Sequence, residues 1–187
     1  MENNGLETEI KVRVHSARYA TSLLTANGFA VRTPRHFEEN LLFDSPSLQL
    51  RNAGQALRLR RTGEHSVLTF KGPQREGPHK SREEIEFGIS DFDSAHTVLE
   101  RLGLEPKFRY EKFRTEYHRL GDPGVVLLDE TPIGDFVEIE GPGPWIDSTA
   151  SKLGFKKSSY VLDSYIRLYF QWCQARGIPP TNMTFAT

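Results

Sequence analysis

The stretch from Glu7 to Lys11, which reads Glu-Thr-Glu-Ile-Lys, constrains this chain more than any other. In a β-strand, side chains alternate between two faces, so Glu7, Glu9 and Lys11 would project together. The two carboxylates would lie roughly 6 to 7 Å apart, from the rise per residue of a strand. This spacing lets both reach one divalent cation, and Lys11 stands one step further along to meet an anion. The stretch predicts a strand with a charged side that faces a ligand.

Several other stretches alternate charged and apolar residues in the same way. The paired charges are Glu84 and Glu86, Glu138 and Glu140, Arg58 and Arg60, and Lys112 and Arg114, with Lys71 and Asp129 as single charges on strands of their own. For any one strand, a face in water is the ordinary explanation. Fully charged positions on so many strands instead indicate an inverted sheet, with a charged interior and an apolar outside. Outer residues such as Ile85, Phe87, Val137 and Ile139 would then need cover from helices.

In their order along the chain, these motifs resemble the CYTH superfamily. That superfamily holds class IV adenylyl cyclases, thiamine triphosphatases and inorganic triphosphatases, together called triphosphate tunnel metalloenzymes. The motifs are Glu-x-Glu-x-Lys at 7–11, Leu57-Arg58-Leu59-Arg60, Thr69-Phe70-Lys71-Gly72, Glu84-x-Glu86, Lys112-Phe113-Arg114 and Phe136-Val137-Glu138-Ile139-Glu140. The resemblance runs from about Glu7 to about Tyr165. It implies an α+β fold in which eight antiparallel strands close into a tunnel with a charged interior and helices packed outside.

The pattern of turns and periodicity agrees with such a barrel. It predicts strands at 6–14, 37–43, 55–61, 66–70, 81–89, 107–119, 125–130 and 135–141, and helices at 17–26, 92–102, 147–153 and 158–176. Ser16 and Asp91 (or Ser90) are the expected helix caps, and Gly28 and Gly103 the expected stops. Residues 49–52 read as a short strand or a turn. We expect one tunnel domain over 1–178 and a flexible tail over 179–187.

Composition limits the classes of function. The 187 residues carry 24 Lys and Arg against 25 Asp and Glu, a net charge of −1, so no general basic surface for nucleic acid is expected. The lone Cys173 excludes an internal disulfide and fits a reducing compartment. No apolar run approaches the length of a membrane span. We therefore expect a soluble cytoplasmic protein without a membrane partner, and a homodimer is compatible with the barrel.

A charged interior predicts a ligand, because unpaired buried charge is costly. A triphosphate with Mg²⁺ or Mn²⁺ supplies both signs: arginine forks suit phosphate oxygens, and carboxylates suit these hard cations. By resemblance, the metal-binding carboxylates are Glu7, Glu9, Asp129, Glu138 and Glu140, and the substrate-binding cations are Lys11, Arg58, Arg60, Lys71, Lys112 and Arg114. Glu84 and Glu86 match acidic positions with a catalytic role, either orienting those cations or holding a second metal. Lys156 and Lys157 match a C-terminal cation of the family, but a solvated helix end is the simpler interpretation.

Other features have simpler explanations. The histidines lack zinc-ligand spacing. Trp145 could stack on a substrate ring, but an apolar residue before a helix cap at Asp147 more often staples the helix start. The segment 72–81 resembles a Walker A loop, yet its lysine comes two residues too late, and Pro73 and Pro78 remove backbone donors.

Three functions remain open. A triphosphatase places water in line with the terminal phosphorus and releases orthophosphate. A class IV adenylyl cyclase converts ATP to cyclic AMP and pyrophosphate with the same charged groups. A module that only binds polyphosphate or nucleotides would need cations without a full set of metal-binding carboxylates. We favour the triphosphatase, because hydrolysis needs neither an adenine pocket nor the exclusion of water.

Overall fold

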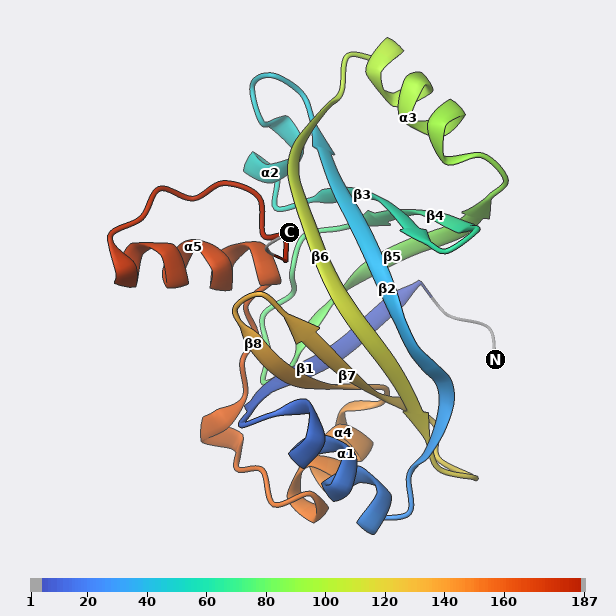
Figure 1. Ribbon diagram of the computed structural model, residues 1–187, viewed down its shortest axis with the longest axis vertical. Helices are drawn as coiled ribbons and strands as arrows, with labels where there is room; N and C mark the ends of the chain where they lie inside the picture. Colours follow the sequence, from blue (N-terminus) through green and yellow to red (C-terminus); the bar gives the residue numbers. More distant parts are fainter. Residues whose placement is uncertain (1–4, 186–187) are drawn as a thin grey trace.

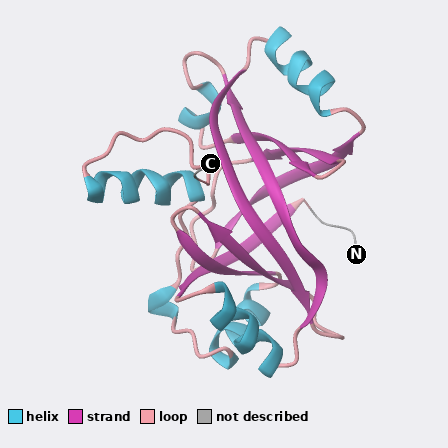
Figure 2. Ribbon diagram, viewed as in Figure 1, coloured by secondary structure: helices cyan, strands magenta, loops and turns pink. Residues whose placement is uncertain are grey.

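The computed structural model describes residues 5–185, and its eight antiparallel strands close into a barrel (Figure 1 and Figure 2). The strands are β1 (Leu6–Val14), β2 (Ala30–Asp44), β3 (Ala56–Thr62), β4 (His65–Lys71), β5 (Lys80–Ile89), β6 (Glu105–His118), β7 (Val125–Thr131) and β8 (Gly134–Glu140). Around the barrel their order is β1-β5-β4-β3-β2-β6-β7-β8. Closure leaves no unpaired edge strand. The predicted eight-stranded closed barrel is confirmed.

The strand registers bring the charged residues together. Between β1 and β8, Glu9 lies opposite Glu140 and Lys11 lies opposite Glu138. Because directly opposed residues share a face of the sheet, these four side chains all point into the barrel. Each inward-facing charged residue of this pair of strands therefore lies directly opposite an inward-facing charged residue on the other strand.

The helices lie outside the barrel. They are α1 (Ala17–Ala26), α2 (Gln49–Asn52), α3 (Phe92–Arg101), α4 (Gly143–Lys152) and α5 (Tyr165–Arg176), with a 3-10 turn at Lys157–Ser159. Helices α1 and α4 lie at one end of the barrel, α3 lies at the other, and α5 lies to one side (Figure 1). No helix within residues 5–185 is both long and apolar enough to cross a membrane.

The hydrophobic core lies between the outer face of the sheet and the helices. Ile10 and Ile139 are fully buried there and pack with Leu24 of α1 and Ile146 of α4. Burial of such side chains contributes roughly 1.5–3 kcal/mol each. The predicted inversion holds for this part of the barrel.

The outer face of β5 does not follow that prediction. Ile85 and Phe87 are 52% and 54% exposed. Helix α3 instead packs through Leu99 against Leu59 of β3 and Phe43 of β2. The expectation that helices cover these two side chains was wrong.

The first helix caps are as predicted, but two nearby boundaries are not. Ser16 accepts a hydrogen bond from the backbone N–H of Tyr19 and so caps α1. Residues 49–52, predicted as a strand or turn, form the short helix α2. Strand β2 begins at Ala30 rather than at residue 37, because shifts in register on either side of Thr33 carry Pro34 within the strand.

The C-terminal region differs more from expectation. Helix α4 begins four residues early, so Trp145 lies within it and packs against Gly124 and Gly141 rather than forming the expected staple. The long helix predicted at 158–176 is interrupted, because Val161 exchanges two backbone hydrogen bonds with Lys11 before α5 starts. Ser164 then caps α5.

The segment after α5 lies against the barrel rather than loose. Met183 is buried, and its backbone carbonyl accepts a hydrogen bond from the N–H of Glu111 on β6. Asn182 accepts another through its side chain from the backbone N–H of Arg109. Residues 182 and 183 thus contact β6, the flexible tail expected over 179–187 stays a prediction, and residues 186–187 lie outside the described part of the chain.

Candidate active site

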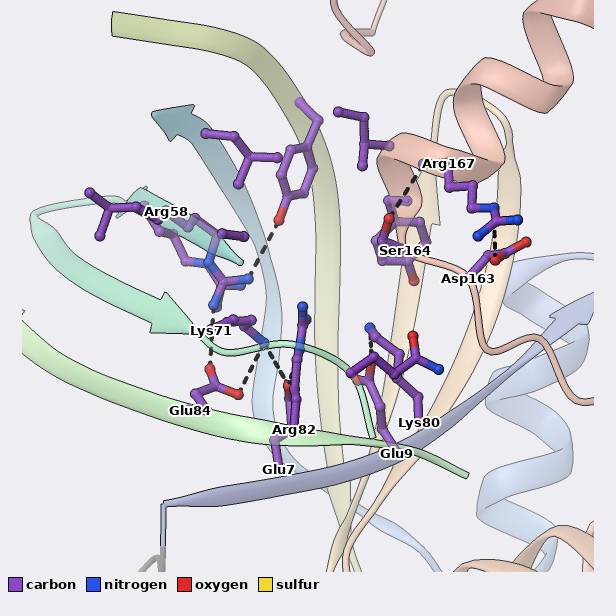
Figure 3. Close-up of a pocket in the computed structure, with 18 of the residues that line it drawn as sticks. Glu7, Glu9, Arg58, Lys71, Lys80, Arg82, Glu84, Asp163, Ser164 and Arg167 are labelled. Carbon is purple, nitrogen blue, oxygen red and sulfur yellow. Dashed lines mark hydrogen bonds and ion pairs between the residues drawn. The ribbon is translucent and has the colours of Figure 1, made fainter. Parts of the chain in front are cut away.

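One cavity of about 1290 Å³ occupies the barrel interior, and twelve of the thirteen predicted site residues line it. They are Glu7, Glu9, Lys11, Arg58, Arg60, Lys71, Glu84, Glu86, Lys112, Arg114, Glu138 and Glu140. They come from every strand of the barrel except β2 and β7. In Figure 3, Arg58, Lys71 and Glu84 point toward one another from adjacent strands.

Lys71 is held between two carboxylates. Its Nζ lies 2.8 Å from both oxygens of Glu7 and 3.0 Å from Oε2 of Glu84. Arg82 Nε also donates to Oε2 of Glu7, at 3.2 Å. Burial and Glu9 would raise the pKa of Glu7, but Lys71 and Arg82 lower it to about 2. Burial and the nearby Glu7 raise the pKa of Glu84.

Arg58 is oriented by a second set of contacts. Its Nη2 lies 3.2 Å from the Thr69 hydroxyl and 3.3 Å from Glu86, and its Nη1 lies 3.4 Å from the Tyr110 hydroxyl. Burial would raise the pKa of Tyr110, yet Arg58 and the nearby cations lower it to about 8. Glu84 and Glu86 thus contact Lys71 and Arg58, which matches the orienting role among the predictions. Their catalytic role itself stays a prediction.

Asp129 is the predicted residue that does not line the cavity. Its carboxylate is fully buried and accepts hydrogen bonds from Arg114 at 2.6 and 2.7 Å, from Lys112 at 2.8 Å and from the Tyr165 hydroxyl at 2.8 Å. Burial would raise its pKa, but Arg114 and Lys112 hold the pKa of Asp129 far below its usual value. The two oxygens of Asp129 accept four hydrogen bonds in all. Asp129 therefore positions Arg114 and Lys112.

A third group of charges surrounds Glu9. Lys11 and Lys80 donate to the same oxygen of Glu9 at 2.8 and 2.5 Å, and Lys11 also lies 3.1 Å from Glu138. Burial would raise the pKa of Glu9, but these lysines hold it well below its usual value. Burial together with Lys11 and Arg82 lowers the pKa of Lys80 to about 8.

Glu140 differs from the other carboxylates. It forms no ion pair within residues 5–185, although it lines the same cavity. Burial, followed by repulsion from Glu7 and Glu9, raises the pKa of Glu140 to about 8. A bound cation would relieve this repulsion.

The donors are suited to a hard divalent cation. Glu7, Glu9 and Glu140 offer only oxygen atoms, which Mg²⁺ and Mn²⁺ prefer. Among residues 5–185, no three Asp, Glu, His or Cys side chains already converge as a metal cluster. Glu7 and Glu9 instead face cations. The chemistry of the donors fits the predicted metal.

Sequence reasoning missed three buried contributors to the site. Lys80 shares the inward parity of Arg82 and Glu84, and that parity could have revealed it. Glu38 lies 3.2 Å from Arg60 and 3.4 Å from Lys112. No charged neighbour at i+2 marked Glu38 in the sequence. The hydroxyl of Tyr165 reaches Asp129 at 2.8 Å, which a helical sequence pattern cannot show.

Lys157 lies away from the cavity. Its Nζ pairs with Asp147 at 2.6 Å, and its side chain is 70% exposed. Lys156 is also exposed. The simpler interpretation of these two lysines, a solvated helix end, agrees with their positions.

The fold and the charged cavity agree with a family relationship. The family model described as the CYTH domain matches residues 5–153. This is most of the chain, so the chain belongs to the CYTH family. The match covers all eight strands and every residue predicted for the site.

Individual relatives support this membership. A provisionally named adenylate cyclase from Methanocaldococcus jannaschii is 29% identical over 135 residues, which are 72% of this chain and 76% of that protein. A structure of a provisionally named adenylate cyclase from Vibrio parahaemolyticus aligns with a TM-score of 0.76 and 20% identity, covering 87% of this chain and 97% of that one. A provisionally named adenylyl cyclase from Hippeastrum, described as having a dominant triphosphatase activity, aligns with a TM-score of 0.63 and 20% identity, covering 93% and 97%. At these identities the two structures establish the fold alone.

Proposed function

We propose that this protein is a divalent-metal-dependent triphosphatase that hydrolyses a triphosphate inside the barrel. The observation that carries the proposal is the single cavity lined by six predicted phosphate-binding cations together with the carboxylates of β1 and β8. A substrate bearing several negative charges and a divalent cation would satisfy both sets of groups. Such a reaction needs mainly positioning and electrostatic stabilisation from the protein.

The cations have the chemistry to bind the phosphate chain. Arg58, Arg60 and Arg114 offer planar forks that match phosphate oxygens, and Lys11, Lys71 and Lys112 offer compact charges. Their partners are carboxylates such as Glu84, Glu86, Glu38 and Asp129. These partners fix each cation before the substrate arrives. Such preorganisation reduces the cost of orienting groups during the reaction.

Glu7, Glu9 and Glu140 are the residues we assign to Mg²⁺ or Mn²⁺, with Glu138 beside them. When bound, the metal supplies Lewis acidity, which withdraws charge from phosphoryl oxygens and lowers the pKa of a coordinated water. Glu138 also contacts Lys11 and Arg114, at 3.1 and 2.6 Å. It therefore links the metal-binding carboxylates to the cations that would hold phosphate.

The same groups would serve a cyclase, so the products decide between the reactions. The protein is incubated with tripolyphosphate and, separately, with ATP, each with Mg²⁺ or Mn²⁺, and products are identified by phosphorus NMR. We expect orthophosphate from tripolyphosphate and no cyclic AMP from ATP. Cyclic AMP with pyrophosphate would instead establish the adenylyl cyclase.

Two variants exclude a contaminating activity. Glu140→Gln removes a proposed metal-binding carboxylate and should abolish turnover. Glu130→Gln alters a carboxylate that pairs with Arg35 outside the cavity, and it should leave turnover intact. Binding of tripolyphosphate without any turnover would indicate a module that only binds polyphosphate.

A further inference from the structure

Lys80 enters the barrel at the point where the pairing between β1 and β5 ends. The last register pair of these two strands is Glu9 opposite Lys80, and Lys80 is the first residue of β5. Its side chain is 6% exposed, lines the cavity and donates to Glu9 at 2.5 Å (Figure 3). Residues 73–78 of the preceding loop are all exposed. Lys80 therefore needs an anchor close by, because the first residue of a strand is poorly held when the chain before it lies in solvent.

His79 provides this anchor outside the barrel. Its side chain is 12% exposed, and its Nε2 lies 2.9 Å from Oδ1 of Asp147 on α4. Lys157, followed by His79 and Tyr160, lowers the pKa of Asp147 to about 2, although burial would raise it. The ionised carboxylate can only accept, so the Nε2–H of His79 donates. The ring rests against Gly143, the first residue of α4, where a Cβ would come 3.1 Å from Cε1 of His79.

The same carboxylate also holds the segment that continues the pairing along β1. Tyr160 donates its hydroxyl to Oδ1 of Asp147 at 3.1 Å. The next residue, Val161, exchanges two backbone hydrogen bonds with Lys11, at 2.8 and 3.1 Å. Val161 thus pairs with β1 just beyond the point where β5 begins. Asp147 therefore joins the residue before Lys80 to the residue before Val161.

The two lysines that these segments hold meet at one carboxylate oxygen. Lys80 and Lys11 both donate to Oε1 of Glu9, at 2.5 and 2.8 Å, and both line the cavity. A lysine ammonium acts on a phosphate as a compact charge, and its attraction falls with distance. The contribution of Lys80 to binding thus depends on where its backbone is held.

We propose that His79 is a positioning residue, which by hydrogen bonding to Asp147 fixes Lys80 in the cavity as a phosphate-binding cation beyond the six already assigned. This inference rests on the proposed function, because the ligand of Lys80 is the phosphate chain of the substrate. Within residues 5–185 the cavity lining includes Lys80 but not His79. His79 therefore acts through the backbone that it shares with Lys80, and a small displacement of a positioned group is enough to weaken its effect.

The test measures the Kd of tripolyphosphate by calorimetry in EDTA. Lys80→Met removes the cation and should raise the Kd about tenfold, as for the loss of one hydrogen bond to a charged group. His79→Ala leaves Lys80 present but poorly held, and should raise the Kd about three- to tenfold. His79→Gln keeps a donor near the position of Nε2 and should restore most of the affinity. The matched control is His96→Ala on α3, which removes a partly buried histidine that pairs with Glu100, and it should change the Kd less than about twofold.

A double-mutant cycle decides whether His79 acts through Lys80. In the background of Lys80→Met, His79→Ala should change the Kd by less than about twofold, because the group that His79 positions is gone. Two full and independent effects would show that His79 only stabilises the fold, and they would overturn the proposal. A Kd for His79→Ala equal to that of the wild type would overturn it as well. Should His79→Ala fail to fold, Gly143→Ala takes its place in the cycle, because the added methyl crowds the His79 ring without removing it.

Binding and turnover together separate failure of this proposal from failure of the proposed function. If tripolyphosphate binds without being hydrolysed and the cycle still couples His79 to Lys80, the hydrolase assignment falls and the positioning role stands. If tripolyphosphate is hydrolysed but His79→Ala leaves its Kd unchanged, the positioning role falls alone. If the wild type does not bind tripolyphosphate, both fall.

Discussion

Individual charged residues are buried here only because other charges compensate them. Asp129 receives hydrogen bonds from three side chains, and Lys71 lies between two carboxylates. An ion buried without a partner costs several kcal/mol even after relaxation. The partners of each buried charge therefore fix its position in the site.

Asp129 is the residue whose partners are least replaceable. Asp129→Asn would leave Arg114 and Lys112 with a buried charge that is no longer fully compensated, at a cost of about 3–5 kcal/mol in the free energy of unfolding. Urea denaturation of the metal-free protein measures this. The adjacent Glu130→Gln is the matched control, since its pair with Arg35 is solvent-exposed and contributes about 1 kcal/mol or less. Equal effects of the two substitutions would contradict the assigned role.

Removing the charge of Glu140 should stabilise the protein in the absence of metal, whereas removing the charge of Asp129 should destabilise it. Its pKa is raised to about 8 from an ordinary 4.5, by burial and then by Glu7 and Glu9. Between these two values the folded protein binds more protons than the unfolded chain, so stability falls as the pH rises, by up to about 1.4 kcal/mol per pH unit. Glu140→Gln removes this titration.

Stability curves in EDTA test the role of Glu140. At pH 8, Glu140→Gln should be more stable than the wild type, and at pH 4.5 the two should converge. Addition of Mn²⁺ should stabilise the wild type and have little effect on the variant. If the free energy of unfolding of the wild type, relative to the variant, instead rises from pH 5 to pH 8, the pKa of Glu140 is not raised by burial as predicted.

At the scale of elements, strict alternation of residue type was enough to locate most of the barrel. Strand β1 alternates charged or polar with apolar residues throughout, and the hairpin of β3 and β4 does so over 57–60 and 68–71; both elements were located within a residue or two. Alternation fails where tertiary contacts decide. Val161 interrupts a helical pattern because it pairs with the backbone of Lys11. Lys80 was missed because Gly and Pro residues precede it, although it shares the parity of Arg82 and Glu84; the register with β1 places it opposite Glu9.

The C-terminal segment offers a test at this scale. Met183 is 1% exposed and fixes the chain that follows α5 onto β6. Met183→Ala should lower the free energy of unfolding by about 2–5 kcal/mol, as for other large-to-small core substitutions. Ile178→Ala, at a position 42% exposed in the same segment, should cost much less. Urea denaturation compares them, and similar values for the two variants would show that this segment contributes little packing.

At the scale of the whole molecule, a nearly neutral chain is divided into a charged interior and an apolar outer face that helices cover in part. The net charge of −1 conceals this division, because cations and carboxylates occupy the same cavity in similar numbers. The barrel has no open edge that could deform, so its inward side chains are held at fixed spacings. This rigidity suits a site that works by positioning.

The direction in which a charge points should therefore decide its effect on ligand binding. Arg60 faces the cavity, where it pairs with Glu38 at 3.2 Å, and its neighbour Arg61 faces outward, where it pairs with Glu39 at 2.6 Å. In EDTA, tripolyphosphate at 100 times its Kd should stabilise the wild type by about 2.7 kcal/mol. Arg60→Ala, which should weaken binding at least about tenfold, should lose about 1.4 kcal/mol of this gain. Arg61→Ala should keep all of this gain, because its guanidinium never meets the ligand.

Urea denaturation of each variant with and without tripolyphosphate separates the effect of the ligand from the effect of the substitution on folding. Equal losses in both variants would mean that tripolyphosphate binds to the outer surface by general charge, and the barrel interior would no longer be the site.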